Sequence, residues 1–134
     1  MARLILDSTI LVASERRATV LDRLIADEDD VAIAAITAAE LLVGVELADA
    51  RRRSSRTAFV EELLSVLPIE DYDLATARTH ALLLAATRQA GKPRGAHDLI
   101  IAATAIRSGR IVITADARGF VGLPDVEIRT LPAG

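Results

Sequence analysis

The segment that says most about the fold is Arg94-Gly95-Ala96-His97-Asp98-Leu99-Ile100-Ile101-Ala102-Ala103-Thr104-Ala105-Ile106. After Asp98, every residue of the stretch is apolar except Thr104. A helix that is apolar on all sides is a buried helix, so we expect one in the core from Asp98 to Gly109. A carboxylate in the interior needs hydrogen bonds, a charged partner or a metal ion. Asp98 is therefore either the N-cap of this helix or part of a functional site.

Short apolar runs alternate with helical patterns along the rest of the chain. The runs predict strands at 3–6, 31–34, 111–114 and 126–129, with an ambiguous segment at 66–69. The helical patterns predict a short turn at 10–14 and helices at 19–26 and 59–67. A further helix begins at Thr37, with Glu40 at its capping-box position, and another runs from Asp71 or Asp73 to Gly91. This alternation indicates a three-layer α/β/α fold with a mainly parallel central sheet, and we expect residues 1–134 to form a single domain.

The composition limits the class of protein. With 51% apolar residues and no cysteine, the 134-residue chain can build a core but no disulfide or thiolate metal site. The sequence shows neither a leader peptide nor an apolar run of the ~18 residues that a membrane span needs, so we expect a cytoplasmic protein. The positive mean hydropathy suggests either a covered surface, such as a homodimer face or a partner groove, or simply a high alanine content.

Four acidic residues fall at comparable places in the predicted fold. Asp7 and Asp116 directly follow the first and third strands, and Glu40 lies in the first turn of the helix after the second strand. Asp98 opens the helix that leads back to the third strand, so it lies at the same end of the sheet. Ligand sites in open α/β sheets lie at the carboxyl ends of the strands, and we expect the four carboxylates to converge there.

Each of these acids also has a purely local explanation, as a helix cap, a capping-box partner or a turn residue. Four unpaired carboxylates at one edge would nevertheless raise one another's pKa, and a divalent cation relieves that repulsion. Oxygen ligands favour Mg²⁺ or Mn²⁺, and such ions activate water and stabilise charge in phosphodiester hydrolysis. Three hydroxyl residues, Ser8, Thr9 and Thr114, would orient a water beside the ion or cap the backbone. We expect His97 to orient its loop rather than bind metal.

Basic residues near the same edge suggest a nucleic-acid substrate. Lys92, Arg94 and Arg118 would hold phosphates or would simply be solvated surface charges. The net charge of −3 excludes a general polycation, so any nucleic-acid binding depends on local basic patches. Since only three residues are aromatic, we expect recognition of a folded RNA by shape and backbone rather than by base stacking.

Four segments together resemble the PIN-domain family, and more closely its VapC toxins from bacterial toxin–antitoxin pairs. They are Leu-Asp7-Ser8-Thr9-Ile-Leu-Val, Ala39-Glu40-Leu41 after a Thr, His97-Asp98-Leu-Ile-Ile-Ala-Ala-Thr-Ala, and Ile-Thr114-Ala-Asp116 followed by Phe120. Proteins of this family usually have Thr or Ser and then Ser or Asn after the first Asp, whereas this chain has Ser8 and then Thr9. A hydroxyl group is kept at both positions.

This resemblance implies an endoribonuclease that depends on Mg²⁺ or Mn²⁺ and cleaves structured RNA such as tRNA or rRNA. It implies that Asp7, Glu40, Asp98 and Asp116 are the catalytic metal ligands. It also implies a homodimer and a cognate antitoxin whose tail covers the acidic site.

Two other enzyme classes with a similar sheet require residues that this chain lacks. A dehalogenase-like phosphatase requires a second Asp where this chain has Thr9, and a receiver domain requires a late-strand Lys, whereas the only lysine, Lys92, lies in a predicted loop. The alternative from a different class is a non-catalytic binding module whose acidic edge receives a basic partner peptide. Metal-dependent cleavage of RNA distinguishes the enzyme from that module.

Overall fold

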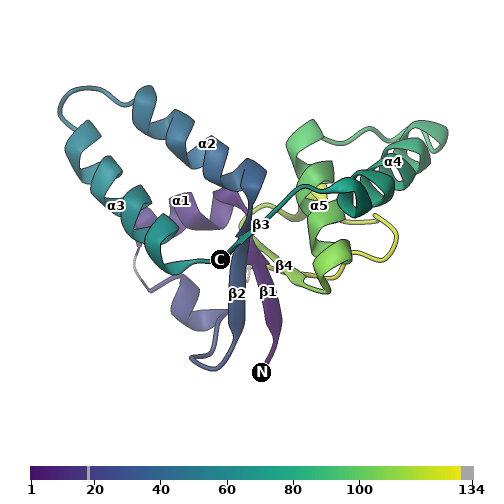
Figure 1. Cartoon of the computed structure of the whole chain (residues 1–134), viewed down its shortest axis with the longest axis horizontal. Coiled ribbons are helices and arrows are strands. Elements are labelled where there is room, and N and C mark those ends of the chain that lie inside the picture. The colour runs from purple at the N-terminus through teal and green to yellow at the C-terminus, as the bar shows by residue number, and fades with distance from the viewer. Residues whose placement is uncertain (18, 131–134) are drawn as a thin grey trace.

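The computed structural model describes residues 1–17 and 19–130, and its centre is one five-stranded parallel sheet (Figure 1). The strand order is β3-β2-β1-β4-β5, and each of the four neighbouring pairs is parallel. The strands are β1 Arg3–Leu6, β2 Asp30–Ala34, β3 Ile69–Glu70, β4 Ile111–Thr114 and β5 Ile128–Thr130. The central strand β1 pairs in register with both neighbours, so that Leu6 lies beside Ile33 and Ile113.

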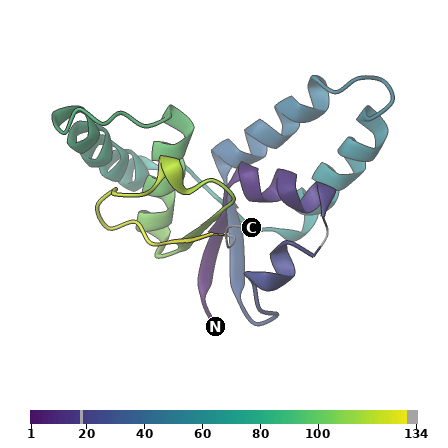
Figure 2. The ribbon, with the colours of Figure 1, turned by 180° about the vertical axis from the view of Figure 1, so that it is seen from behind.

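Helices cover both faces of this sheet. They are α1 Ser8–Arg16, α2 Ala35–Glu46, α3 Arg53–Val66, α4 Leu74–Gln89 and α5 Ala96–Ser108, with short 3₁₀ turns η1 Leu21–Arg23 and η2 Ala117–Gly119. Side chains alternate across β1: Leu4 and Leu6 pack with residues of α1, α2 and α3, whereas Ile5 packs with α4 and α5. Figures 1 and 2 show the two helical groups spreading apart on opposite sides of the sheet.

The three-layer α/β/α prediction is therefore confirmed, and so are several helix ends. Asp73 begins α4, where its carboxylate accepts a 2.9 Å hydrogen bond from the Thr76 backbone N–H. Gly109 ends α5 in the left-handed conformation, with φ at 67°. The ambiguous 66–69 segment contributes the two-residue strand β3. None of the helices described between residues 1 and 130 is long and apolar enough to cross a membrane.

Some predicted boundaries are wrong. The 19–26 helix is only the 3₁₀ turn η1, because Val20 and Leu24 fill the core from a segment too short to support a stable helix. Thr37 is not a cap: α2 begins at Ala35, and the Thr37 side chain is buried within its first turn. The last strand begins at Ile128, two residues later than predicted.

The start of the buried helix also differs from the prediction. Helix α5 begins at Ala96 with Gly95 as its N-cap, so Asp98 is the third residue of the helix and not its cap. The 10–14 turn is likewise part of a longer helix, α1, because Asp7 caps it at Ser8. Asp98 therefore projects from the first turn of a helix that is buried along most of its length.

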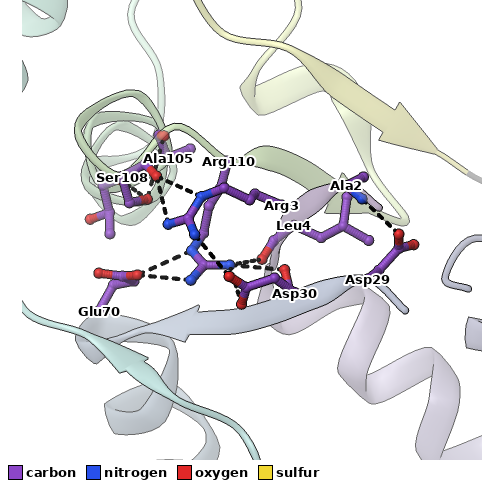
Figure 3. A network of polar contacts seen from close by, with 10 residues as sticks. Ala2, Arg3, Leu4, Asp29, Asp30, Glu70, Ala105, Ser108 and Arg110 are labelled. Carbon is purple, nitrogen blue, oxygen red and sulfur yellow. Dashed lines mark hydrogen bonds and ion pairs between the residues drawn. The ribbon is translucent and has the colours of Figure 1, made fainter. Parts of the chain in front are cut away.

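A buried arginine fixes the opposite, amino-terminal ends of the strands (Figure 3). The side chain of Arg110 is 4% exposed and donates to the backbone oxygens of Leu4 and Asp30. It also pairs with the carboxylates of Asp30 at 3.1 Å and Glu70 at 3.0 Å. Arg3 adds a second cation to Asp30 at 2.8 Å. This network ties Leu4 of β1 and Asp30 of β2 to Glu70, the last residue of β3.

Candidate active site

Asp7 is the most deeply placed of the four acids, since it joins β1 to α1 and is only 2% exposed. Its Oδ1 accepts hydrogen bonds from the Thr9 hydroxyl at 2.7 Å and the Ile10 backbone N–H at 3.1 Å. Its Oδ2 accepts one from the Thr114 hydroxyl at 2.6 Å. Burial raises the pKa of Asp7, and these hydrogen bonds oppose the rise because they stabilise the ionised form. Thr9 and Thr114 thus orient this carboxylate directly.

Glu40 projects from α2 toward the same edge. Its Oε2 lies 3.3 Å from the Ser8 hydroxyl and 3.4 Å from Nδ1 of His97, which is half exposed. Its Oε1 is buried and has no hydrogen-bond partner. A buried carboxylate oxygen without a partner carries a desolvation cost, so this atom is suited to a ligand that supplies positive charge. Ser8 and His97 hold the other oxygen in place.

Asp98 lies among the other three acids. Burial is the largest cause of its raised pKa, followed by the negative charges of Asp7, Glu40 and Asp116. Each of the other three acids therefore lies within electrostatic range of Asp98. Gly119 of η2 approaches Asp98 so closely that a Cβ on Gly119 would stand 2.2 Å from Oδ2 of Asp98. The backbone at Gly119 therefore packs directly on this carboxylate.

Asp116 follows β4 and caps η2, where its Oδ1 accepts a hydrogen bond from the Arg118 backbone N–H at 3.1 Å. The Arg118 side chain forks onto both carboxylate oxygens at 2.9 and 2.7 Å. This pairing lowers the pKa of Asp116 to about 2. Arg118 thus offsets one of the four negative charges from within the chain.

The donor chemistry fits a hard divalent cation. Every candidate ligand is a carboxylate oxygen, and the buried Oε1 of Glu40 has no hydrogen-bond partner. The negative charges of the other three acids disfavour the ionised form of Asp98, and a bound cation would relieve this repulsion. In residues 1–17 and 19–130, no three acidic or histidine side chains stand close enough to hold one ion as they are oriented. The ion pair between Arg118 and Asp116 accounts for part of the separation between the acids, because both oxygens of Asp116 face the Arg118 guanidinium.

The three basic residues suggested for phosphate binding have different environments. Lys92 is exposed in the loop before α5. Arg94 donates to the backbone oxygens of Lys92 and Val121, both at 2.7 Å, so it fastens two loops together and its guanidinium is largely committed. Arg118 is 90% exposed and paired with Asp116. Of the three, Lys92 and Arg118 extend toward solvent.

Sequence reasoning missed the roles of Gly119 and of the Arg118 fork. The packing of Gly119 on Asp98 joins residues from two elements, and the sequence pattern around each element gives no sign of it. The Arg118 fork could have been predicted from the sequence, because Arg118 follows Asp116 by two residues. An Asp that caps a short turn can accept a hydrogen bond from the backbone N–H of such a residue and also pair with its side chain. The sequence analysis gives Arg118 as a phosphate ligand or a solvated surface charge, and not as the partner of Asp116.

Comparison with known proteins agrees with this fold. The family model described as PIN domain matches residues 4–125. The ribonuclease VapC of Rickettsia bellii is 28% identical over 96% of both chains. The tRNA(fMet)-specific endonuclease VapC of Salmonella typhimurium is 34% identical over 72% of this chain and 71% of its own length. In the crystal structure of VapBC-5, a VapBC toxin–antitoxin system from Mycobacterium tuberculosis, the similar chain superimposes with a TM-score of 0.81 at 30% identity, over 98% of this chain and all of that one.

The class of protein that the fold defines is a PIN domain. The chain belongs to the PIN-domain family and, within it, to the VapC ribonucleases. PIN-domain nucleases use divalent metal ions, in agreement with the donor chemistry of this edge.

Proposed function

We propose that this chain is the toxin of a toxin–antitoxin pair and an endoribonuclease that hydrolyses structured RNA with Mg²⁺ or Mn²⁺ at the four-carboxylate edge. The observation that carries the proposal is the buried, unpartnered Oε1 of Glu40 at the edge where the negative charges of Asp7, Glu40 and Asp116 act on Asp98. A purely structural set of caps would not need to share one region. The single nuclease domain would span residues 1–134 and act in the cytoplasm, where its RNA substrate is found.

The four carboxylates have distinct tasks in this proposal. Asp7 is positioned by two threonines, and Asp98 packs against the backbone of Gly119. Glu40 contributes its unpartnered Oε1, and Asp116 joins when Arg118 releases it. When bound, a divalent ion activates water and stabilises the negative charge that develops on the phosphate.

Residues around the carboxylates position the reacting groups. The hydroxyls of Thr9 and Thr114 lie 3.1 Å apart and both contact Asp7, so they hold its two oxygens in a fixed orientation. Ser8 donates to one oxygen of Glu40, Oε2, and leaves Oε1 without a partner. Lys92 and a released Arg118 would contact the RNA phosphates beside the cleaved bond, with weak individual contributions. Arg94 would contribute mainly by holding its loop.

The relatives support the partners and the substrate class. The Salmonella relative is a tRNA(fMet)-specific endonuclease, which makes tRNA the first RNA to test. The VapBC-5 structure is of a toxin–antitoxin system, and we propose a cognate antitoxin for this chain as well. We also propose a homodimer, and the exposed Leu74 and Leu82 on α4 provide apolar surface for such a contact.

The test is cleavage of total cellular RNA by the purified, antitoxin-free protein. We expect discrete fragments with Mg²⁺ or Mn²⁺, and none with a chelator or with Asp98→Asn. Fragments that survive both controls would contradict the proposed site. Metal binding without cleavage of total RNA, tRNA or ribosomes would favour the binding module whose acidic edge receives a basic peptide.

A further inference from the structure

A groove leads away from the acidic edge between α1, α2 and α3. It consists of two adjoining hollows, which share Glu15, Arg56 and Phe59. The first, of about 190 Å³, begins at Ser8 and Glu40 and is mostly apolar. The second, of about 580 Å³, opens between the end of α1 and the start of α3. The groove is therefore continuous with the proposed active site.

Positive charge gathers at the far end of this groove. Arg16 and Arg52 line the second hollow together with Arg56. Arg56 pairs with Glu15 at 3.0 Å, whereas Arg16 and Arg52 are exposed and make no ion pair within the part of the chain that the structure describes. One acid thus lines this hollow against three arginines, although the whole chain carries a net charge of −3.

Helix α3 spaces these groups along one face. Arg52 and Arg56 stand four residues apart at its start, about 6 Å along the axis, and Phe59 follows on the next turn toward Glu40. Phe59 is partly buried and borders both hollows. The order along the groove is therefore arginines, then an aromatic side chain, then the acidic edge.

We propose that this groove binds the RNA substrate on one side of the cleaved bond, with backbone phosphates at Arg16 and Arg52 and a base against Phe59. The inference rests on the proposed ribonuclease function and adds where the substrate runs. Arginine guanidinium groups suit phosphate oxygens, and the apolar wall suits the face of a base. Such contacts are largely independent of sequence, as expected for recognition of folded RNA by its backbone.

The test compares Arg16→Gln/Arg52→Gln with a control that removes the same charge elsewhere, Arg23→Gln/Arg88→Gln. Both control arginines are exposed and make no side-chain hydrogen bond in the described chain. Binding of fluorescently labelled, unfractionated tRNA is measured by anisotropy in EDTA, where no cleavage occurs. Cleavage of the same tRNA is then followed with Mn²⁺.

We expect the groove variant to bind tRNA roughly tenfold more weakly and to lower the slope of log K against log salt by about 1.5, because two phosphate contacts are lost. Its KM for tRNA should rise while its kcat stays unchanged, and the control should match wild type. Equal binding by both variants overturns the inference and assigns the groove to a protein partner, such as the antitoxin. Wild-type protein that fails to cleave any RNA overturns the proposed function itself.

Discussion

Gly119→Ala should disable the site without unfolding the protein. The glycine lies in η2, and a Cβ there would stand 2.2 Å from Oδ2 and 2.6 Å from Cγ of Asp98. Both atoms belong to the carboxylate on which the negative charges of Asp7, Glu40 and Asp116 act. The added methyl group must therefore push Asp98 away or displace the whole 3₁₀ turn.

The size of the effect follows from these distances. Asp98 and the new methyl group must separate by roughly 1 Å to reach an ordinary contact, and a misplacement of that size costs about 100-fold in rate. We expect kcat/KM for RNA cleavage to fall by about that factor, equivalent to ~2.7 kcal/mol of transition-state stabilisation. Overpacking should lower the free energy of unfolding by about 1–3 kcal/mol.

Gly95→Ala gives a graded comparison at the same oxygen. A Cβ on Gly95 would lie 3.2 Å from Oδ2 of Asp98, so a shift of a few tenths of an ångström suffices. We expect a loss of less than tenfold. Steady-state cleavage of tRNA with Mn²⁺, with urea denaturation of each variant, measures both quantities. Wild-type activity in a folded Gly119→Ala protein would contradict the role given to the contact between Gly119 and Asp98. A larger loss of kcat/KM in Gly95→Ala than in Gly119→Ala would contradict it as well.

Three further predictions concern charge. Arg118→Gln should tighten Mn²⁺ binding about two- to fivefold by calorimetry, because the exposed guanidinium no longer competes with the ion for Asp116. Weaker Mn²⁺ binding by the variant would contradict this competition. Asp98→Asn should raise the metal-free melting temperature at pH 7, because it removes a charge that burial and the neighbouring acids disfavour. The pKa of Asp98 in the folded protein lies above 3.8, so its ionised carboxylate destabilises the wild-type fold at neutral pH. The difference in melting temperature between variant and wild type should therefore vanish as the pH falls through that raised pKa toward 3.8. A difference that grows on acidification would contradict this prediction. Arg110→Met should lower the free energy of unfolding by about 3 kcal/mol in urea, against less than ~1 kcal/mol for the more exposed Arg3→Gln, and equal losses would show that burial is not the cause.

The layered fold was predictable because the core follows simple periodicities. The apolar run after Asp98 has no polar face, and it forms the most buried helix, α5. Leu4 and Ile5 lie on opposite faces of the sheet, and both faces are covered, as an unbroken apolar strand requires. The 19–26 pattern misled because buried residues four apart suit a helix and an irregular, core-facing turn equally well.

The positions of the four acids relative to the sheet could be predicted because parallel strands place their carboxyl ends at one edge, whereas their role as one metal site stays a prediction. Their individual environments could not be predicted, since these depend on contacts between distant residues. The Thr114 hydroxyl reaches Asp7 across 107 positions of sequence, and Ser8 reaches Glu40 across 32. The commitment of Arg94 to the oxygen of Val121 likewise depends on how two loops meet. Spacing in the sequence carries no such information.

The most direct test of the account is a Mn²⁺ titration followed by electron paramagnetic resonance of the free ion. Wild type is compared with Asp7→Asn, Glu40→Gln, Asp98→Asn and Asp116→Asn, and with Asp27→Asn as an exposed acidic control far from these residues in sequence. If the four carboxylates share one divalent site, each of the four variants binds Mn²⁺ at least tenfold more weakly and the control binds as wild type. Wild-type affinity in all four variants would contradict the account, because the carboxylates would then have no common ligand.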